Sequence, residues 1–196
     1  MNGKKVAIVT GGTRGMGRNI SLALAEAGNI VVAVYLSNEE SAIETLNLLR
    51  DISPDSEVVK GDVSKSDDVK RIVSYVAEKY KRIDILVNNA GVFDFMFLED
   101  MTEEYLDRII SINFKSQFLL TQACLPYMKK NNYGRIINAS SISGTIADVG
   151  LIGYGVSKAC VIMFTKIAAA ELAPYKITVN SYAPGIIHTD MTDEMI

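Results

Sequence analysis

The sequence predicts an α/β fold in which helices cover both faces of one parallel sheet. Short runs of β-branched and apolar residues alternate with longer segments of helix-forming residues, which is typical of repeated strand–helix–strand units. Several of the short runs are almost wholly apolar, as expected for strands that are buried on both faces. A glycine-rich segment separates the first run from the first helical segment, so the sheet is predicted to be doubly wound.

The alternation predicts six strands and five helices. The expected strands, in chain order, are Val6 to Thr10, Ile30 to Leu36, Glu57 to Lys60, Ile83 to Asn88, Arg135 to Ser140 and Ile177 to Tyr182. The expected helices are Gly17 to Ala27, Glu39 to Arg50, Asp67 to Tyr80, Glu103 to Lys130 and Tyr154 to Leu172. Ser66 and Thr102 precede helical segments and are predicted to be their N-caps. Neither a linker nor a repeat divides the chain, so residues 1–196 are expected to form a single domain.

Charge and composition exclude several classes of protein. The chain has 20 Lys and Arg against 23 Asp and Glu, which is too balanced for nucleic-acid binding. The apolar run at residues 6–10 is too short for a signal peptide or a membrane span, so we expect a cytoplasmic protein without a membrane partner. Cys124 and Cys160 lie far apart and without a neighbouring histidine pair, so neither a disulfide framework nor a metal site is expected.

The glycine-rich segment predicts a phosphate site. Between Thr10 and Gly17 the chain reads TGGTRGMG, with Gly11, Gly15 and Gly17 at the spacing G-x-x-x-G-x-G and with Thr13 and Met16 between them. Glycines allow a phosphate to approach the backbone, and the N-terminus of the next helix offers unpaired amides. A Rossmann-type dinucleotide site is therefore predicted, although a tight turn without a ligand would need the same glycines.

Residues after the second predicted strand favour NADP(H) over NAD(H). NAD-binding proteins usually place an acid here, where it binds the adenosine ribose. The segment Tyr35-Leu36-Ser37-Asn38 contains no acid. The Arg14 guanidinium, beside the glycine turn, could instead pair with a 2′-phosphate with help from the Ser37 hydroxyl. The alternative is that Arg14 is an ordinary solvated arginine.

Tyr154 and Lys158 lie four residues apart in the last predicted helix and so share one helix face. The pKa of an ordinary tyrosine, about 10, is too high for proton exchange near neutral pH. A neighbouring ammonium such as Lys158 stabilises the phenolate and is expected to lower that pKa. Because this spacing is also common on amphipathic helices, the pair alone does not establish catalysis.

Several motifs occur together and in order. The glycine turn is followed by Asn88-Asn89-Ala90-Gly91, Asn113, Ser141, the Tyr154–Lys158 pair and Pro184-Gly185. This set resembles the short-chain dehydrogenase/reductase family over essentially the whole chain. The resemblance implies hydride transfer between a nicotinamide and a small-molecule carbonyl or secondary alcohol. It also implies a proton from Tyr154 to an oxygen held by Ser141.

The resemblance assigns further residues to the catalytic and cofactor sites. Asn113 is expected to hold a water in the proton relay from Lys158, which also binds the nicotinamide ribose. Asp62 and Val63 are expected to bind the adenine, although Asp62 could equally cap the helix near Ser66. The remaining expected contacts, which line the cofactor site or close over the nicotinamide, are Asn89, Ala90, Gly91, Pro184, Gly185, Ile187 and Thr189.

Within the family, the chain is most similar in character to bacterial reductases of 3-oxoacyl groups carried by acyl carrier protein. The glycine turn, Arg135-Ile136-Ile137 and Ile177-Thr178-Val179-Asn180 carry this similarity. Members that dock the carrier protein have arginines where this chain has Asn132 and Tyr175. The lysines nearby cannot replace them, because an ammonium does not make the paired hydrogen bonds of a guanidinium. A carrier-bound substrate, and with it a place in fatty acid biosynthesis, is therefore left open.

The resemblance also bears on assembly and on the end of the chain. The predicted helices Glu103 to Lys130 and Tyr154 to Leu172 are expected to pack in a homodimer or homotetramer. Family members continue into a substrate lid and a seventh strand, so residues 190–196 are expected to begin a lid that is cut short, leaving the sheet without its last strand.

Two other functions remain open at this point. The chain could oxidise a sugar or another secondary alcohol with NAD(P), or it could hold NADP(H) as a sensor without turnover. The intact Ser141, Tyr154 and Lys158 argue against a sensor, which needs no proton donor. The apolar segment that contains Phe93, Phe95, Met96 and Phe97 suggests an apolar approach to the site, although such residues more often belong to a core.

Overall fold

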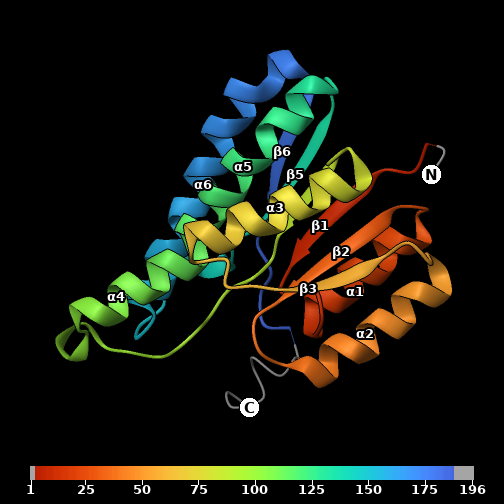
Figure 1. Ribbon diagram of the computed structural model, residues 1–196. Coiled ribbons are helices and arrows are strands. Elements are labelled where there is room, and N and C mark those ends of the chain that lie inside the picture. Colours follow the sequence, from red (N-terminus) through yellow and green to blue (C-terminus); the bar gives the residue numbers. More distant parts are fainter. Residues whose placement is uncertain (1–2, 188–196) are drawn as a thin grey trace.

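The computed structural model describes residues 3–187 and shows a six-stranded parallel sheet between two layers of helices (Figure 1). The strands are β1 (Val6–Thr10), β2 (Ile30–Tyr35), β3 (Glu57–Lys60), β4 (Ile85–Asn88), β5 (Gly134–Ala139) and β6 (Ile177–Tyr182). Their order in the sheet is β3-β2-β1-β4-β5-β6, so the winding reverses between β1 and β4. The predicted doubly wound α/β fold is confirmed.

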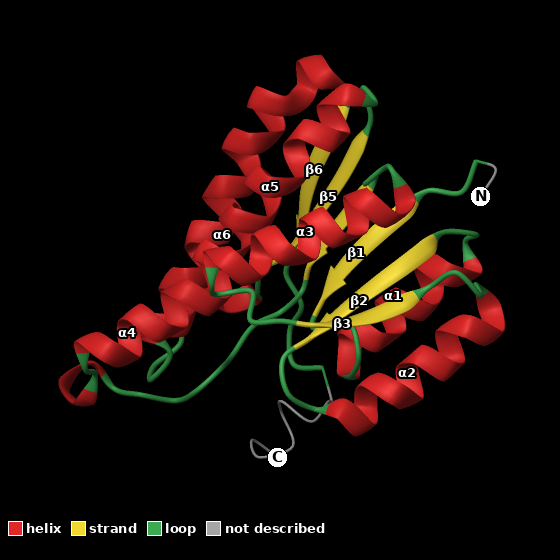
Figure 2. Cartoon of the chain, viewed as in Figure 1, coloured by secondary structure: helices red, strands yellow, loops and turns green. Residues whose placement is uncertain are grey.

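The helices join the strands in the expected alternation (Figure 2). They are α1 (Gly15–Glu26), α2 (Glu39–Ile52), α3 (Ser66–Tyr80), α4 (Glu103–Ile110), α5 (Ser116–Lys130) and α6 (Ile152–Leu172). The Thr102 hydroxyl caps α4 by accepting from the Tyr105 amide at 3.2 Å, as predicted. The N-cap prediction for Ser66 is wrong, because Ser66 is the first helical residue and Lys65 precedes it without a side-chain cap.

The single helix predicted from Glu103 to Lys130 is interrupted by a π-helical turn at Ser111–Lys115. The Asn113 amide group explains the interruption. Its Nδ2 donates to the Val92 carbonyl at 2.9 Å, and its Oδ1 accepts from the Val92 amide at 2.8 Å. A π turn widens the backbone spiral by one residue, and such turns are frequent at functional sites.

Two apolar cores lie on opposite faces of the sheet. On one face α3, α5 and α6 pack against alternate residues of the strands, such as Ile8, Val32 and Leu86. On the other face α1 and α2 pack against the intervening residues of β1, β2 and β4. The first two strands are buried on both faces, as predicted, whereas β6 alternates between buried and exposed residues. No helix between residues 3 and 187 is long and apolar enough to cross a bilayer.

Candidate active site

The carboxyl ends of the parallel strands bring the predicted site residues to one edge of the sheet. The glycine turn follows β1, Asn89 follows β4, and Ser141 follows β5. Because the winding reverses at β1 and β4, the loops that leave these two strands diverge and open a crevice between them. This edge is where a doubly wound sheet binds its ligand.

The glycine turn has the conformation that a close backbone approach requires. Gly11 and Gly15 both have positive φ, at 60° and 51°. A Cβ at Gly17 would overlap the carbonyl oxygen of Gly11, so no other residue fits there without moving the turn. Arg14 is the N-cap of α1 and gives no side-chain cap, so the first turn of the helix can offer its amides to an anion.

Asn89 joins this turn to the rest of the sheet edge. Its Nδ2 donates to the carbonyl oxygens of Thr10 and Gly11, at 3.1 and 3.3 Å. The Thr10 hydroxyl in return accepts from the amides of Asn89 and Ala90, both at 3.0 Å. The Tyr182 hydroxyl, at the end of β6, donates to Asn89 Oδ1 at 2.9 Å. Three strand ends are thereby held in fixed relative positions.

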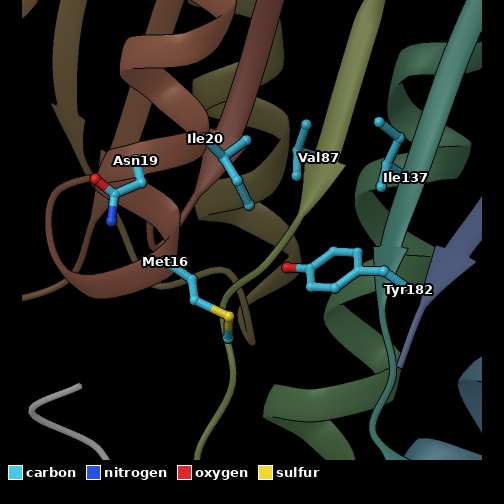
Figure 3. A pocket seen from close by; sticks show the side chains of 6 residues that line it. All are labelled: Met16, Asn19, Ile20, Val87, Ile137 and Tyr182. Carbon is cyan, nitrogen blue, oxygen red and sulfur yellow. The ribbon is translucent and has the colours of Figure 1, made fainter. Parts of the chain in front are cut away.

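A cavity of about 420 Å³ opens next to the glycine turn (Figure 3). Its lining combines the first turns of α1 with the ends of β4, β5 and β6, and consists of Met16, Asn19, Ile20, Val87, Ile137 and Tyr182. Figure 3 shows the Met16 thioether and the Tyr182 ring facing each other across it. Ile20, Val87 and Ile137 make most of the remaining wall apolar.

The residues expected around the adenosine are brought to the same edge but have other partners as well. Asp62 Oδ1 accepts from the amide and hydroxyl of Ser64, at 3.0 and 2.6 Å, so one carboxylate oxygen holds the turn before α3. Val63 is buried, and the side chains of Arg14 and Ser37 are exposed. The alternative of a local structural role for Asp62 is thus supported for that oxygen, in a turn rather than a helix cap.

The structure distinguishes the two adjacent serines after β5. The buried Ser140 hydroxyl donates to the Lys158 carbonyl at 3.0 Å and so belongs to the scaffold. Ser141 Oγ accepts from the Ser143 amide at 3.3 Å and also makes a hydrogen bond with Tyr154. The hydrogen bond from Ser141 lowers the pKa of Tyr154, so the Ser141 hydroxyl donates to the phenol oxygen. Of the two serines, Ser141 is therefore the one bonded to Tyr154, and its role in orienting a substrate stays a prediction.

Lys158 lies almost wholly buried beneath Tyr154. Its Nζ is 5.4 Å from the centre of the Tyr154 ring and donates to the Ala139 carbonyl at 3.0 Å. Gly91 borders the ammonium, since a Cβ there would lie 3.5 Å from Nζ, an ordinary van der Waals distance. Burial lowers the pKa of Lys158 to about 8. The predicted pair therefore exists, but its cation is strongly desolvated.

The pKa of Tyr154 corrects one expectation. Burial raises it above the ordinary value, and a hydrogen bond from Ser141 acts in the opposite direction without cancelling the effect. The expected lowering by Lys158 is not found, because the ammonium donates to Ala139 rather than to the phenol oxygen. Tyr154 is therefore a protonated phenol at neutral pH, which suits a proton donor better than a base.

Asn113 lies in the site but is held differently from the expectation. Its side chain is occupied by Val92 and by Ser157 Oγ, to which Nδ2 donates at 3.1 Å. Its backbone carbonyl accepts from Gln117 Nε2 at 3.0 Å. Both the side chain and the backbone carbonyl of Asn113 therefore have protein partners, and its role in a proton relay stays a prediction.

The loop after β6 reaches the serine loop. The Pro184 carbonyl accepts from the Ile142 amide at 3.1 Å, so Pro184 lies beside Ser141. Gly185 and Ile187 follow as exposed residues. The expected contact at Thr189 and the expected lid at residues 190–196 lie outside the described residues.

The structure adds two residues to the predicted site, Tyr182 and Asp148, and places Phe93 of the expected apolar approach beside Tyr154. The Phe93 ring packs edge-on against Tyr154, and the Tyr182 phenol supports Asn89. Asp148 Oδ2 accepts from the Ser143 hydroxyl at 2.5 Å and so steadies the loop that orients Ser141. The aromatic cluster at residues 93–97 was a signal for Phe93, whereas no sequence pattern pointed to Tyr182 or Asp148.

Comparison with known proteins agrees with this geometry. The family model described as short chain dehydrogenase matches residues 5–196. The 3-oxoacyl-acyl-carrier-protein reductase of Staphylococcus aureus is 40% identical over 191 residues, which cover 97% of this chain and 78% of the relative. Nodulation protein G of Azospirillum brasilense is 42% identical over 188 residues, covering 96% and 76%.

A solved structure shows the same architecture. A short-chain dehydrogenase from Streptomyces avermitilis superposes with a TM-score of 0.88 at 31% identity, covering 97% of this chain and 69% of that one. The likeness extends over nearly every described element.

Lys158→Met should raise the free energy of unfolding at pH 7. The folded pKa of about 8 lies below the ordinary value of 10.5, a difference that corresponds to about 3 kcal/mol when the lysine is charged. Loss of the bond to Ala139 offsets about 1 kcal/mol of this, so a net gain of about 2 kcal/mol is expected.

Urea unfolding of both proteins at several pH values tests this prediction. The unfolded chain binds more protons than the folded chain between pH 8 and 10.5, so wild-type stability should rise through this window relative to the methionine variant. Parallel stability curves for the two proteins would show that Lys158 is not desolvated.

Proposed function

Because the chain belongs to the short-chain dehydrogenase family, we propose that this oxidoreductase reduces a carbonyl group to a secondary alcohol with NADP(H). The observation that carries the proposal is the placement of Ser141, Tyr154 and Lys158 together at the carboxyl edge of the sheet. A half-buried, protonated phenol beside a serine hydroxyl is suited to protonating an oxygen. A cytosolic location stays a prediction.

The residues at the glycine turn fit a dinucleotide. The first turn of α1 has no side-chain cap and leaves backbone amides for a pyrophosphate. Gly17 allows the turn to pack closely, since a Cβ there would overlap the Gly11 carbonyl oxygen. Gly11, Thr13, Gly15, Met16 and Gly17 would hold the pyrophosphate, and Arg14 with Ser37 would bind the 2′-phosphate. The other proposed contacts are Asp62, Val63, Asn89, Ala90, Gly91, Pro184, Gly185, Ile187 and Thr189.

The chain's own residues supply the proton and orient the carbonyl. The bound cofactor would supply the hydride. Ser141 would donate a hydrogen bond to the carbonyl oxygen, and Tyr154 would transfer its proton to that oxygen as the alcohol forms. The phenolate left behind would be stabilised by Lys158, whose ammonium lies 5.4 Å from the ring centre. Solvent protons would return through Lys158 and a water held by Asn113.

The protonated state of Tyr154 favours reduction over the alternative, oxidation of a sugar or another secondary alcohol. Oxidation needs the phenolate as a base, and burial disfavours the phenolate. A sensor that only binds NADP(H) would need neither the Ser141 hydroxyl nor the buried Lys158 ammonium. Keeping such an ammonium buried costs stability, which argues for a chemical role.

The substrate class suggested by the relative is a 3-oxoacyl thioester. The positions expected to bind a carrier protein hold Asn132 and Tyr175, and the Lys129 ammonium lies 4.1 Å from the Tyr175 ring centre. This cation is near the start of β6, at the opposite edge of the sheet from the carboxyl edge that carries the site. We therefore propose that the substrate is a free thioester or ketone and not one bound to a carrier protein.

Arg14→Ala should weaken NADPH binding about tenfold to a hundredfold and leave NADH binding nearly unchanged. A charge-assisted hydrogen bond contributes about 1.5–3 kcal/mol, and only NADPH has the 2′-phosphate that Arg14 would bind. Dissociation constants from fluorescence titration of both cofactors test this. Equal weakening of both, or no wild-type preference for NADPH, would contradict the assignment of Arg14.

Tyr154→Phe should keep NADPH affinity and lose about 10² to 10⁴-fold in the rate of ketone reduction, since only the proton donor is removed. Lys158→Ala should lower both cofactor affinity and rate. The matched control is Tyr75→Phe, which deletes a phenol oxygen that donates to Glu57 at the start of β3, at the edge of the sheet opposite the site. The measurement is loss of NADPH absorbance, and a phenylalanine variant as fast as wild type would refute the mechanism.

We also propose that α5 and α6 pair with a second copy of the chain. Phe118 on α5 contacts Phe164 on α6, with ring centres 6.4 Å apart, and beside them Val156, Met163 and Ile167 leave apolar surface exposed along α6. Exposed apolar patches of this kind mark protein interfaces.

Sedimentation of the wild-type chain should therefore give a dimer or tetramer. Met163→Glu should shift the association equilibrium toward the monomer, because a charge would be buried at the contact. A wild-type chain that sediments as a strict monomer at micromolar concentration would rule this out.

A further inference from the structure

Three phenylalanines lead away from Tyr154 over the surface. The Phe93 ring stands edge-on to Tyr154 with centres 5.0 Å apart, and the Phe95 ring stands edge-on to Phe93 at 5.3 Å. Phe95 and Phe97 both lie against Gly150, where a Cβ would be 3.3 and 3.9 Å from their ring carbons. We call Phe93, Phe95 and Phe97 the phenylalanine track.

The outer part of the track is exposed although the loop that carries it is held in place. Phe95 and Phe97 expose 58% and 57% of their surface. The Met96 amide between them donates to the Gly150 carbonyl at 2.8 Å. Asp94, just before them, is bonded through its carbonyl to the Tyr105 hydroxyl and through its carboxylate to Arg108, both at 3.2 Å.

A fixed apolar surface in water is unfavourable unless something covers it, and sites for small molecules are lined by such surfaces. One end of the track touches the proposed proton donor, so a substrate whose carbonyl lies at Tyr154 can extend along it. We propose that the phenylalanine track binds an uncharged apolar chain attached to the substrate carbonyl. This assignment rests on the proposed carbonyl reduction.

The charge around the track selects against an anionic chain. From Asp94 to Arg108 the loop and α4 contain a single base, Arg108, which is paired with Asp94. The same segment has six acids, which are Asp94, Glu99, Asp100, Glu103, Glu104 and Asp107. A carboxylate at the far end of the chain would meet this negative field, whereas an alkyl end would not.

Straight-chain methyl ketones from butanone to decanone test the assignment. Burial of one methylene contributes about 0.8 kcal/mol, so kcat/KM with NADPH should rise about fourfold per methylene until the track is filled. A keto acid as long as decanone, with its carboxylate at the far end, should lose most of that gain.

Phe95→Ala and Phe97→Ala should flatten the dependence on chain length while leaving kcat/KM for butanone and the dissociation constant of NADPH close to wild type. Both side chains are exposed, so the variants are expected to fold. Ile43→Ala removes an equally exposed apolar side chain, 61% accessible on α2, and should retain the wild-type dependence.

The outcomes separate this assignment from the proposed function. If the ketones are reduced at rates that do not depend on chain length, the assignment of the track is wrong and the proposed carbonyl reduction stands. The same holds if the dependence survives in both phenylalanine variants. If no ketone is reduced, the proposed reduction of simple ketones fails, and ligand-observed NMR then decides the track by itself. Decanone binding that weakens at least tenfold in Phe95→Ala supports the track, and equal binding to wild type and variant overturns it.

Discussion

The exchange of hydrogen bonds between Asn113 and Val92 fixes the relative positions of most parts of the site. Both polar atoms of the Asn113 amide bind the backbone of the segment that follows β4. The same nitrogen donates to Ser157, whose hydroxyl is bonded in turn to the Tyr154 carbonyl at 2.6 Å. One buried side chain thus ties the loop after β4 to the helix that carries Tyr154 and Lys158. The π turn at Ser111–Lys115 is the local distortion that this arrangement requires.

The site also shows where chemistry and stability oppose each other. Lys158 is nearly inaccessible, and one carbonyl is the acceptor recorded for its ammonium. Tyr154 is half-buried, and this desolvation raises its pKa. A core built only for stability would have apolar residues at both positions. The desolvation of the Lys158 ammonium is consistent with its proposed role, which is to stabilise the phenolate of Tyr154.

The sequence was sufficient for the fold class because β-branched runs and helical periodicity are local signals. The motifs at Gly17, Asn89, Ser141 and Tyr154 were predictable because each depends on residue type and order. The π turn was not, since helical periodicity continues through Asn113 and only the contact with Val92, distant in sequence, distorts it. The direction of the Tyr154 pKa shift was missed for a similar reason, because spacing shows that Lys158 is near but not that its ammonium is bonded to Ala139.

The division between rigid elements and loops separates the residues of the proposed chemistry from those of the proposed substrate site. Ser141 and Tyr154 stand at the ends of β5 and α6, and their geometry is fixed by the sheet. The phenylalanine track stands on the loop after β4, where substitutions do not disturb strand pairing. Family membership therefore supports the chemistry at Tyr154 but not the identity of the substrate. The substrate must be inferred from surfaces such as Phe95 and Phe97, which are exposed near the proposed proton donor.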